Sequence, residues 1–218
     1  MPAPSPDRLQ LERELWRQLP CTLAGIDEAG RGPIAGPVVA AALVLPRSWA
    51  EAGVPREYQA LNDSKKLSAR QRVKFHDLIR ADSRLHHAIA IVSPELIDQI
   101  NILAATHLAM NKALASLPSP VGFALVDGTR VPTLIVDHRP VVRGDSLSYS
   151  IAGASVLAKV TRDRIMEEAE VLHPGYGFAI HKGYPTPQHL AALRRLGPCP
   201  IHRTTFAPVR DTQISLFP

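Results

Sequence analysis

The alternation of apolar and polar positions along the chain predicts a sheet whose first strands pair with each other. Apolar, β-rich runs cover 21–27 and 36–46, and the short loop between them contains Gly30 and Gly32. Two such runs on either side of a glycine-containing loop are typical of a β-hairpin. Further apolar runs predict strands over 85–92, 121–128 and 132–138, with a turn between the last two.

Apolar residues at helical spacing predict helices around these strands. Ser68 is a suitable N-cap for a helix that begins at residue 69, and Ser93 followed by Pro94 marks the start of a long helix. The expected helices cover 9–19, 69–81, 93–117, 148–172 and 186–197. Strands that first pair and then alternate with long helices indicate the α/β class, with a mixed sheet covered by helices.

The composition fits one domain with an ordinary core. The chain has 218 residues, of which 45% are hydrophobic and 21% charged, so wholesale disorder is excluded. No apolar run reaches the ~18 residues that a membrane span needs, and the N-terminus lacks the order of a secretory signal, so we expect a cytoplasmic protein. Cys21 and Cys199 form no CxxC pair and indicate neither a disulfide framework nor a zinc site.

Positive charge is concentrated near the C-terminus. Lysine and arginine number 25 against 20 aspartates and glutamates, a formal net charge of +5. Residues 181–218 contain five of the cations and one anion, 5 − 1 = +4 of that net charge. A basic face of this kind favours a polyanionic partner such as nucleic acid, although an ordinary solvated surface would give the same pattern.

Carboxylates beside apolar strands are the informative anomaly. Asp27 and Glu28 follow one apolar run, Asp127 follows another, and Asp145 precedes the long helix that begins near residue 148. A carboxylate near a buried sheet costs several kcal/mol unless a cation or hydrogen bonds compensate it. Converging carboxylates form an all-oxygen site suited to Mg²⁺ or Mn²⁺, and two such ions ~3.5–4 Å apart can promote phosphodiester hydrolysis.

Two observations leave this assignment open at the level of single residues. Each aspartate could instead cap a helix or form a turn, as Asp127 followed by Gly128 commonly does. Asp137 also closes an apolar run, and its spacing alone does not exclude it from the site. The loop Gly30-Arg31-Gly32 would let backbone N–H groups approach a phosphate or a sugar, but many glycine-rich loops are only turns.

Taken together, these segments resemble the type 2 ribonucleases H, and among them the bacterial ribonuclease HII family. The resemblance spans roughly residues 21–209. The matching segments, in the order of the family, are AGIDEAGRGPIAGPVVAAALVL, LNDSKKLS, INILAATHLAM, ALVDG, RGDSLSYSIAGASVLAKVTRDRIM, YGFAIHKGYPTPQHLAAL and GPCPIHRTTFAPV. The related ribonuclease HIII carries an extra N-terminal domain, whereas only 20 residues precede Cys21 here, so the resemblance favours ribonuclease HII.

The resemblance implies a ribonuclease H-like fold, with a mixed central β-sheet flanked by helices and an added helical C-terminal part. The resemblance covers a catalytic domain at 21–209; we expect an N-terminal extension with a short helix at 1–20, which is not part of the family pattern, and a C-terminal tail at 210–218. The family's catalytic acids match Asp27, Glu28, Asp127 and Asp145, which would hold two divalent cations, Mn²⁺ or Mg²⁺; Asp137 has no match.

The resemblance also assigns substrate contacts. The Gly30-Arg31-Gly32 loop would hold the ribonucleotide at its 2′-hydroxyl, the group that distinguishes RNA from DNA. Tyr184 would stack on the deoxyribose that follows the ribonucleotide. We further expect phosphate contacts from cations in polar segments near the acidic site: Lys65, Lys66, Lys159, Lys182 and Arg203.

The expected activity is that of a monomeric endonuclease. It would hydrolyse the RNA strand of RNA/DNA hybrids and incise 5′ to ribonucleotides embedded in duplex DNA, leaving 3′-hydroxyl and 5′-phosphate ends. Two alternatives remain at this point. One is an inert module that only binds hybrids, and the other is a nuclease of the same fold that acts on DNA junctions.

The last residues suggest a docking peptide. Gln213-Ile214-Ser215-Leu216-Phe217 resembles the QLSLF-type pentapeptide by which bacterial repair proteins bind the DNA sliding clamp. Leu216 and Phe217 would enter an apolar pocket, and the amide of Gln213 would orient the peptide. The alternative is a tail that folds back and buries both apolar residues on its own domain.

Overall fold

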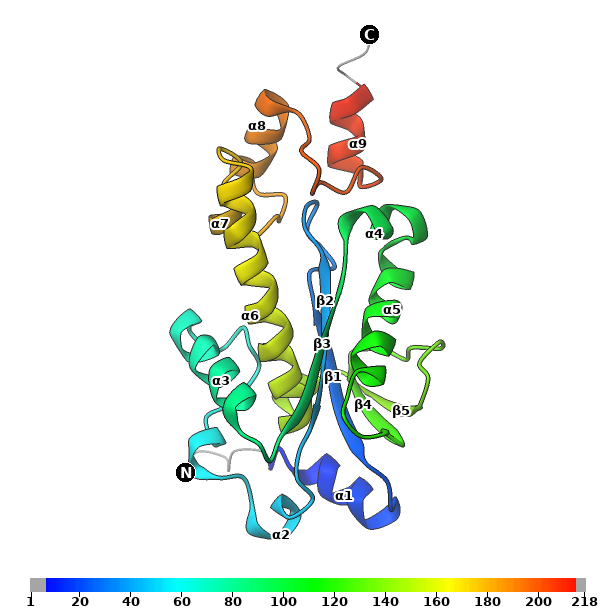
Figure 1. Ribbon diagram of the computed structural model, residues 1–218. Helices are drawn as coiled ribbons and strands as arrows, with labels where there is room; N and C mark the ends of the chain where they lie inside the picture. Colours follow the sequence, from blue (N-terminus) through cyan, green and yellow to red (C-terminus); the bar gives the residue numbers. More distant parts are fainter. Residues whose placement is uncertain (1–6, 215–218) are drawn as a thin grey trace.

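A five-stranded mixed sheet forms the centre of the protein (Figure 1), and the computed structural model describes residues 7–214, apart from the side chains of residues 213 and 214. The strands lie in the order β3-β2-β1-β4-β5. Their bounds are β1 Leu23–Ala29, β2 Val38–Val44, β3 His86–Val92, β4 Phe123–Asp127 and β5 Asp137–Val141. β1, β2 and β3 pair antiparallel, whereas β1, β4 and β5 pair parallel, so the predicted mixed sheet and the first hairpin are confirmed.

Helices cover both faces of this sheet. Their bounds are α1 Gln10–Gln18, α2 Trp49–Ala52, α3 Ala69–Ala81, α4 Pro94–Ile100, α5 Ile102–Ala115, α6 Tyr149–Leu172, α7 Phe178–His181, α8 Pro187–Leu196 and α9 Ala207–Ile214, with 3-10 turns at Arg56–Tyr58 and Gly144–Ser146. Figure 1 shows α3 and α6 on one face, α4 and α5 on the other, and α7, α8 and α9 together at one end. The predicted helical C-terminal part is thereby confirmed.

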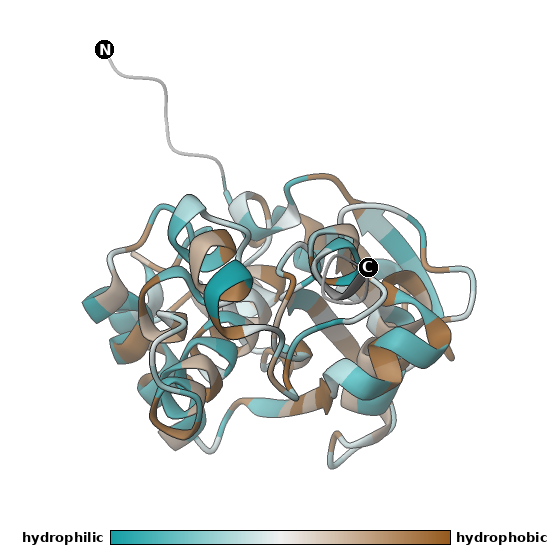
Figure 2. Cartoon of the chain, turned by 90° about the horizontal axis from the view of Figure 1, so that it is seen from above, coloured by the Kyte–Doolittle hydropathy of each residue, from teal (hydrophilic) through white to brown (hydrophobic). Residues whose placement is uncertain are grey.

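Small residues bring the layers close together. Alanine, valine, leucine and isoleucine fill one core between the sheet and α6 and another between the sheet and α5. Hydrophobic and hydrophilic positions alternate around the helices, as Figure 2 shows. A side chain at Gly25 would collide with the backbone of Ser150, so glycine there lets the first turn of α6 lie directly on β1. This contact lies two residues before Asp27, and it fixes the distance between that residue and α6.

Two predicted elements differ in the structure. The helix expected over 93–117 is two helices, because Asn101 adopts a positive φ of 66° and its side chain accepts hydrogen bonds from the backbone N–H groups of Leu103 and Ala104. The strand expected over 132–138 begins only at Asp137, and it pairs parallel to β4 rather than forming a hairpin with it. The apolar residues 133–136 precede the strand.

The N-terminal helix is an integral part of the domain. Leu9, Leu15 and Trp16 are buried in the core that α6 shares with the sheet. The fully buried carboxylate of Glu12 accepts hydrogen bonds from Ser148 Oγ (2.6 Å), Ser150 N (3.0 Å) and Ser150 Oγ (2.8 Å), and so it ties α1 to the start of α6. The boundary expected after residue 20 marks no break in packing.

The C-terminal segment is more ordered than an extended tail. α9 continues to Ile214, so the first part of the predicted tail at 210–218 is helical. Gln213 belongs to this helix by its backbone. Leu216 and Phe217 lie outside the described residues.

Candidate active site

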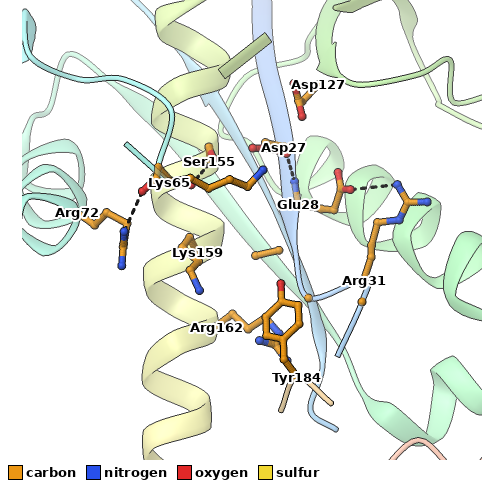
Figure 3. Close-up of a pocket in the computed structure, with 14 residues that line it drawn as sticks. Asp27, Glu28, Arg31, Lys65, Arg72, Asp127, Ser155, Lys159, Arg162 and Tyr184 are labelled. Carbon is orange, nitrogen blue, oxygen red and sulfur yellow. Dashed lines mark hydrogen bonds and ion pairs between the residues drawn. The ribbon is translucent and has the colours of Figure 1, made fainter. Parts of the chain in front are cut away.

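Strand register brings two of the predicted catalytic acids together. β1 and β4 run parallel with Ile26 opposite Val126, so the next residues, Asp27 and Asp127, lie side by side on neighbouring strands. Both residues face the α6 side of the sheet, because side chains alternate along a strand and Ile26 and Val126 face the opposite core. Figure 3 shows the two carboxylates in one cavity.

The other two acids reach the same region from different directions. Glu28 follows Asp27 and turns toward Arg31, whose guanidinium lies 3.4 Å from the Glu28 carboxylate. Asp145 lies in the 3-10 turn after β5. The preceding residue, Gly144, donates its backbone N–H to Asp127 Oδ1 over 2.7 Å, so this turn is fixed beside the end of β4.

The electrostatics of these groups disfavour negative charge. Burial raises the pKa of Asp27 well above its ordinary value, and the charges of Glu28 and Asp127 raise it further. Burial also raises the pKa of Glu28, against the lowering effect of Arg31. Burial, the charge of Asp127 and that of Asp63 raise the pKa of Asp145 to about 6. A bound cation would relieve this repulsion and restore ionised carboxylates.

The residue types fit a divalent cation of the hard class. Carboxylate oxygens are the ligands that Mg²⁺ and Mn²⁺ prefer, and the groups above are brought together from three segments of the chain. Within residues 7–214, no three His, Cys, Asp or Glu side chains stand close enough to form a complete ligand cluster. To share a cation, these carboxylates would have to move closer together.

A cavity of about 400 Å³ contains most of the predicted site. Predicted residues that line it are Asp27, Glu28, Gly30, Arg31, Gly32, Lys65, Asp127, Lys159 and Tyr184. In Figure 3, Lys65 and Lys159 lie along one side of the cavity and Arg31 along the other. A space bordered by both carboxylates and cations suits a phosphodiester, since the cations can hold the phosphates while the acidic end holds metal.

Besides Ala29, sequence reasoning missed four polar residues that line this cavity: Ser64, Arg72, Ser155 and Arg162. Ser155, Lys159 and Arg162 recur at helical spacing on α6, and such a polar stripe in an apolar helix could have identified them. Ser155 Oγ donates to Ser64 Oγ over 3.0 Å, a contact that fixes the loop carrying Lys65 against α6.

Three predicted cations do not line the cavity. Lys66 Nζ donates to Ser146 Oγ over 3.0 Å, next to Asp145. Lys182 forms an ion pair with Glu167 at 2.7 Å. The third cation, Arg203, is described with the loop below.

Asp137 is separated from the acidic site by the length of a strand. It begins β5 opposite Phe123, whereas Asp127 lies opposite Val141 at the other end of the same pairing. Four residue steps at ~3.3 Å each place Asp137 roughly 13 Å away along the sheet. The structure therefore excludes Asp137 from the set of acidic residues at the site.

Two buried arginines hold the segment 30–37, which begins with the Gly30-Arg31-Gly32 loop. Arg162 donates to the carbonyl oxygens of Ala35 and Pro37, and the fully buried Arg203 donates to those of Gly30 (2.6 Å), Arg31 (3.0 Å) and Gly36 (2.8 and 2.9 Å). All of these acceptors are backbone groups. The phosphate contact expected of Arg203 is therefore wrong: its side chain is not exposed and instead positions the loop.

Tyr184 stands opposite that loop. Its side chain is half exposed, and a ring carbon would lie 3.5 Å from a Cβ placed on Gly32. Gly30 has a φ of 99°, and a side chain there would collide with Arg162, so the close packing of the loop depends on glycine. The loop and Tyr184 thus form two walls of one cavity (Figure 3).

Several carboxylates lie at the ends of parallel strands of this mixed sheet, beside a cavity lined by cations. This arrangement defines the class of protein: a divalent-metal-dependent nuclease of the ribonuclease H-like fold. The family model described as Ribonuclease HII matches residues 24–209, and the chain therefore belongs to the ribonuclease HII family. It is a ribonuclease H, and membership implies activity on RNA/DNA hybrids.

Relatives and solved structures agree with this assignment. The chain is 50% identical to ribonuclease HII of Chlamydia abortus over 92% of this chain and 91% of that protein, and 51% identical to ribonuclease HII of Rhizorhabdus wittichii over 91% and 93%. The crystal structure of ribonuclease H2 from Pyrococcus horikoshii matches with a TM-score of 0.73 and 27% identity, over 89% of this chain and 98% of that one.

Another solved structure supports the fold alone. Bst-RNase HIII in complex with Mn²⁺ matches with a TM-score of 0.70 and 17% identity, over 90% of this chain and 70% of that one. The family and the fold predicted from the sequence are confirmed. Within residues 7–214, no helix is long and apolar enough to cross a membrane.

Proposed function

We propose that this ribonuclease hydrolyses the RNA strand of hybrids and also incises 5′ to single ribonucleotides embedded in duplex DNA, leaving 3′-hydroxyl and 5′-phosphate ends. The observation that supports this proposal is the shared cavity of about 400 Å³, in which carboxylates, the Gly30-Arg31-Gly32 loop and Tyr184 meet. A site with these parts can hold a phosphodiester, sense a 2′-hydroxyl and contact the adjacent sugar. We expect the enzyme to act as a monomer.

Asp27, Glu28, Asp127 and Asp145 would hold two divalent cations, Mg²⁺ or Mn²⁺. Such ions, when bound, activate water for attack on phosphorus and neutralise charge on the leaving 3′-oxygen. The raised pKa values of Asp27, Glu28 and Asp145 support this assignment, because carboxylates that destabilise one another gain most from a cation.

The remaining residues would bind and orient the substrate. Backbone N–H groups of the glycine loop would contact the ribonucleotide at its 2′-hydroxyl, and the two buried arginines would keep that loop rigid. Tyr184 would stack on the following deoxyribose. Lys65 and Lys159 would contact phosphates, which fix register without reading base sequence. Lys66 and Lys182 lie outside the cavity and would contact phosphates further along the duplex.

The test uses a labelled duplex with one ribonucleotide in Mg²⁺ or Mn²⁺. Asp27→Asn and Asp127→Asn should each lower kcat at least about 100-fold while circular dichroism stays unchanged. Asp137→Asn is the matched control, because that residue lies outside the site, and it should cut at the wild-type rate. Near-normal cutting by either site variant would contradict the metal assignment. Equal cutting of a ribonucleotide-free junction would indicate a junction nuclease, and binding without cutting would indicate an inert module.

We also propose that the C-terminal peptide, through Gln213, Leu216 and Phe217, docks on the DNA sliding clamp. The support is the pentapeptide pattern in the sequence. A single anchor of this size should bind with a Kd on the order of 1 μM. Because α9 continues to Ile214, deletion of 215–218 leaves the described helix in place and should abolish clamp binding without changing oligonucleotide cleavage. Retained binding would refute the docking role, and lost cleavage would indicate a tail that folds back on the domain.

A further inference from the structure

Three buried histidines lie behind Tyr184 and outside the cavity. His181, His189 and His202 have exposed fractions of 8%, 0% and 2%. The rings of His181 and His189 stack with centroids 4.3 Å apart, and Nε2 of His189 lies 3.1 Å from Nε2 of His202. Nothing in the proposed chemistry uses these groups.

The partners of the histidines determine where each proton lies. His189 Nδ1 is 2.9 Å from the carbonyl oxygen of Tyr184, and because a carbonyl only accepts, Nδ1 carries the proton. Nε2 of His189 is then an acceptor, so Nε2 of His202 must donate to it. Nδ1 of His202, then without a proton, accepts from the backbone N–H of Cys199 over 3.0 Å and lies 3.1 Å from the Cys199 thiol; the carbonyl oxygen of Cys199, at 3.3 Å, can accept no proton from it in this tautomer.

Both rings must be neutral for this chain of bonds to exist. Burial lowers the pKa values of His189 and His202 to about 4, which keeps both neutral at pH 7. The network therefore runs in one direction, from Cys199 through two histidines to the backbone of Tyr184.

The same histidines lie on segments that bond to the glycine loop. His181 Nδ1 accepts from Gly183 N over 3.2 Å, and Gly183 O accepts from Ile34 N over 2.9 Å. His202 forms an isolated β-bridge with Ala35. The turn that carries Tyr184, the segment that carries His202 and the end of the glycine loop are thus one hydrogen-bonded unit.

We propose that the His189–His202 hydrogen bond positions Tyr184 against the Gly30-Arg31-Gly32 loop and so sets the enzyme's preference for a single ribonucleotide in DNA. This inference rests on the proposed function, in particular on the contact between Tyr184 and the deoxyribose. The histidines are positioning residues, because they act through the backbone of Tyr184. On a substrate with many ribonucleotides, the enzyme can bind and cut at several positions. Cleavage of such a substrate therefore depends less on the contact between Tyr184 and one deoxyribose.

The experiment compares kcat/KM on a duplex with one ribonucleotide and on a continuous RNA/DNA hybrid. In His202→Asn, the shorter side chain can still accept from Cys199 N but cannot reach His189. We expect its single-ribonucleotide to hybrid ratio to fall by about three- to tenfold, the effect of one hydrogen bond. His86→Asn is the matched control, because His86 is exposed on β3, and it should keep the wild-type ratio.

A double variant separates positioning from general damage. In a Tyr184→Ala background, His202→Asn should lower the ratio no further, since the group it positions is gone. A full additional loss would overturn the inference. If Tyr184→Ala alone leaves the ratio unchanged, the proposed role of Tyr184 fails; if it lowers the ratio while His202→Asn does not, only the histidine inference fails.

A measurement on the wild-type protein remains informative even if the variants fold poorly. Nitrogen-15 chemical shifts of the histidine rings at pH 7 distinguish the two neutral tautomers. We expect the proton on Nδ1 of His189 and on Nε2 of His202. The opposite tautomer at either ring, or a charged ring, would overturn the network.

Discussion

Replacement of Arg203 tests the idea that a buried cation shapes the substrate loop. Arg203→Met keeps most of the apolar stem and removes the guanidinium that bonds the carbonyls of Gly30, Arg31 and Gly36. The side chain has no exposed surface in the native protein. Each buried carbonyl left without its donor costs ~1–3 kcal/mol, so three of them at the lower end give a loss of about 3 kcal/mol.

The loss is measured by urea unfolding. The two tryptophans, Trp16 and Trp49, are both buried in the core, so their fluorescence reports the transition. A loss of about 3 kcal/mol corresponds to a fall in Tm of roughly 6–12 °C for a chain of this size. Arg203→Lys should lose less, because one ammonium can still serve one of the three carbonyls.

A matched control and a contrary outcome make this test decisive. Arg210 is exposed on the neighbouring α9 and pairs only with Asp211 among the described residues, so Arg210→Met should change the free energy of unfolding by less than about 0.5 kcal/mol. If Arg203→Met loses under 1 kcal/mol and instead weakens substrate binding with a shallower salt dependence, Arg203 is a phosphate contact and the positioning role is refuted.

Three further outcomes follow from the site. Because the pKa of Asp145 is raised to about 6, ionisation of this carboxyl destabilises the fold as pH rises from about 4 to 6. In urea titrations at pH 7 with a chelator present, Asp145→Asn should therefore raise the free energy of unfolding by about 1–2 kcal/mol. An unchanged free energy of unfolding would contradict the idea that the charge of Asp145 is destabilising. Mg²⁺ or Mn²⁺ at ~100 times its Kd should stabilise the wild-type protein by about 2.7 kcal/mol, and EDTA should reverse this in thermal melts, whereas Asp27→Asn should gain clearly less. Tyr184→Ala should lower cleavage of single embedded ribonucleotides more than cleavage of long hybrids, and equal losses in the two assays would argue against stacking.

Local signals predicted the elements well where the controlling contacts are local. Ser68 caps α3 with a full capping box, and Ser93 caps α4, both at the expected positions. The break at Asn101 was not expected, because it depends on one residue with positive φ inside an otherwise helical pattern. The edge strand β5 was misplaced because its sequence, DHRPV, is mostly exposed and lacks the apolar run that was used to find strands.

Long-range contacts explain what the sequence could not predict about the site. Asp27, Glu28 and Asp127 could be identified by their position after apolar runs, but the register of β1 with β4 was needed to bring Asp27 and Asp127 together, and that of β4 with β5 to exclude Asp137. Arg203 was expected at the surface because arginine is usually exposed. Its partners are backbone carbonyls, which have no signature in a sequence.

The mixed sheet also determines the order in which the active site can form during folding. In the antiparallel half, β1 pairs with β2 and β2 with β3, so each strand pairs with the next strand along the chain, although α3 lies between β2 and β3. In contrast, β1 and β4 are about 100 residues apart in the sequence. Parallel pairing over that separation must close a long loop, which costs entropy and slows folding. We expect the antiparallel half to form first, during synthesis, and to lack Asp127 beside Asp27. Nuclease activity would then arise only with the complete fold.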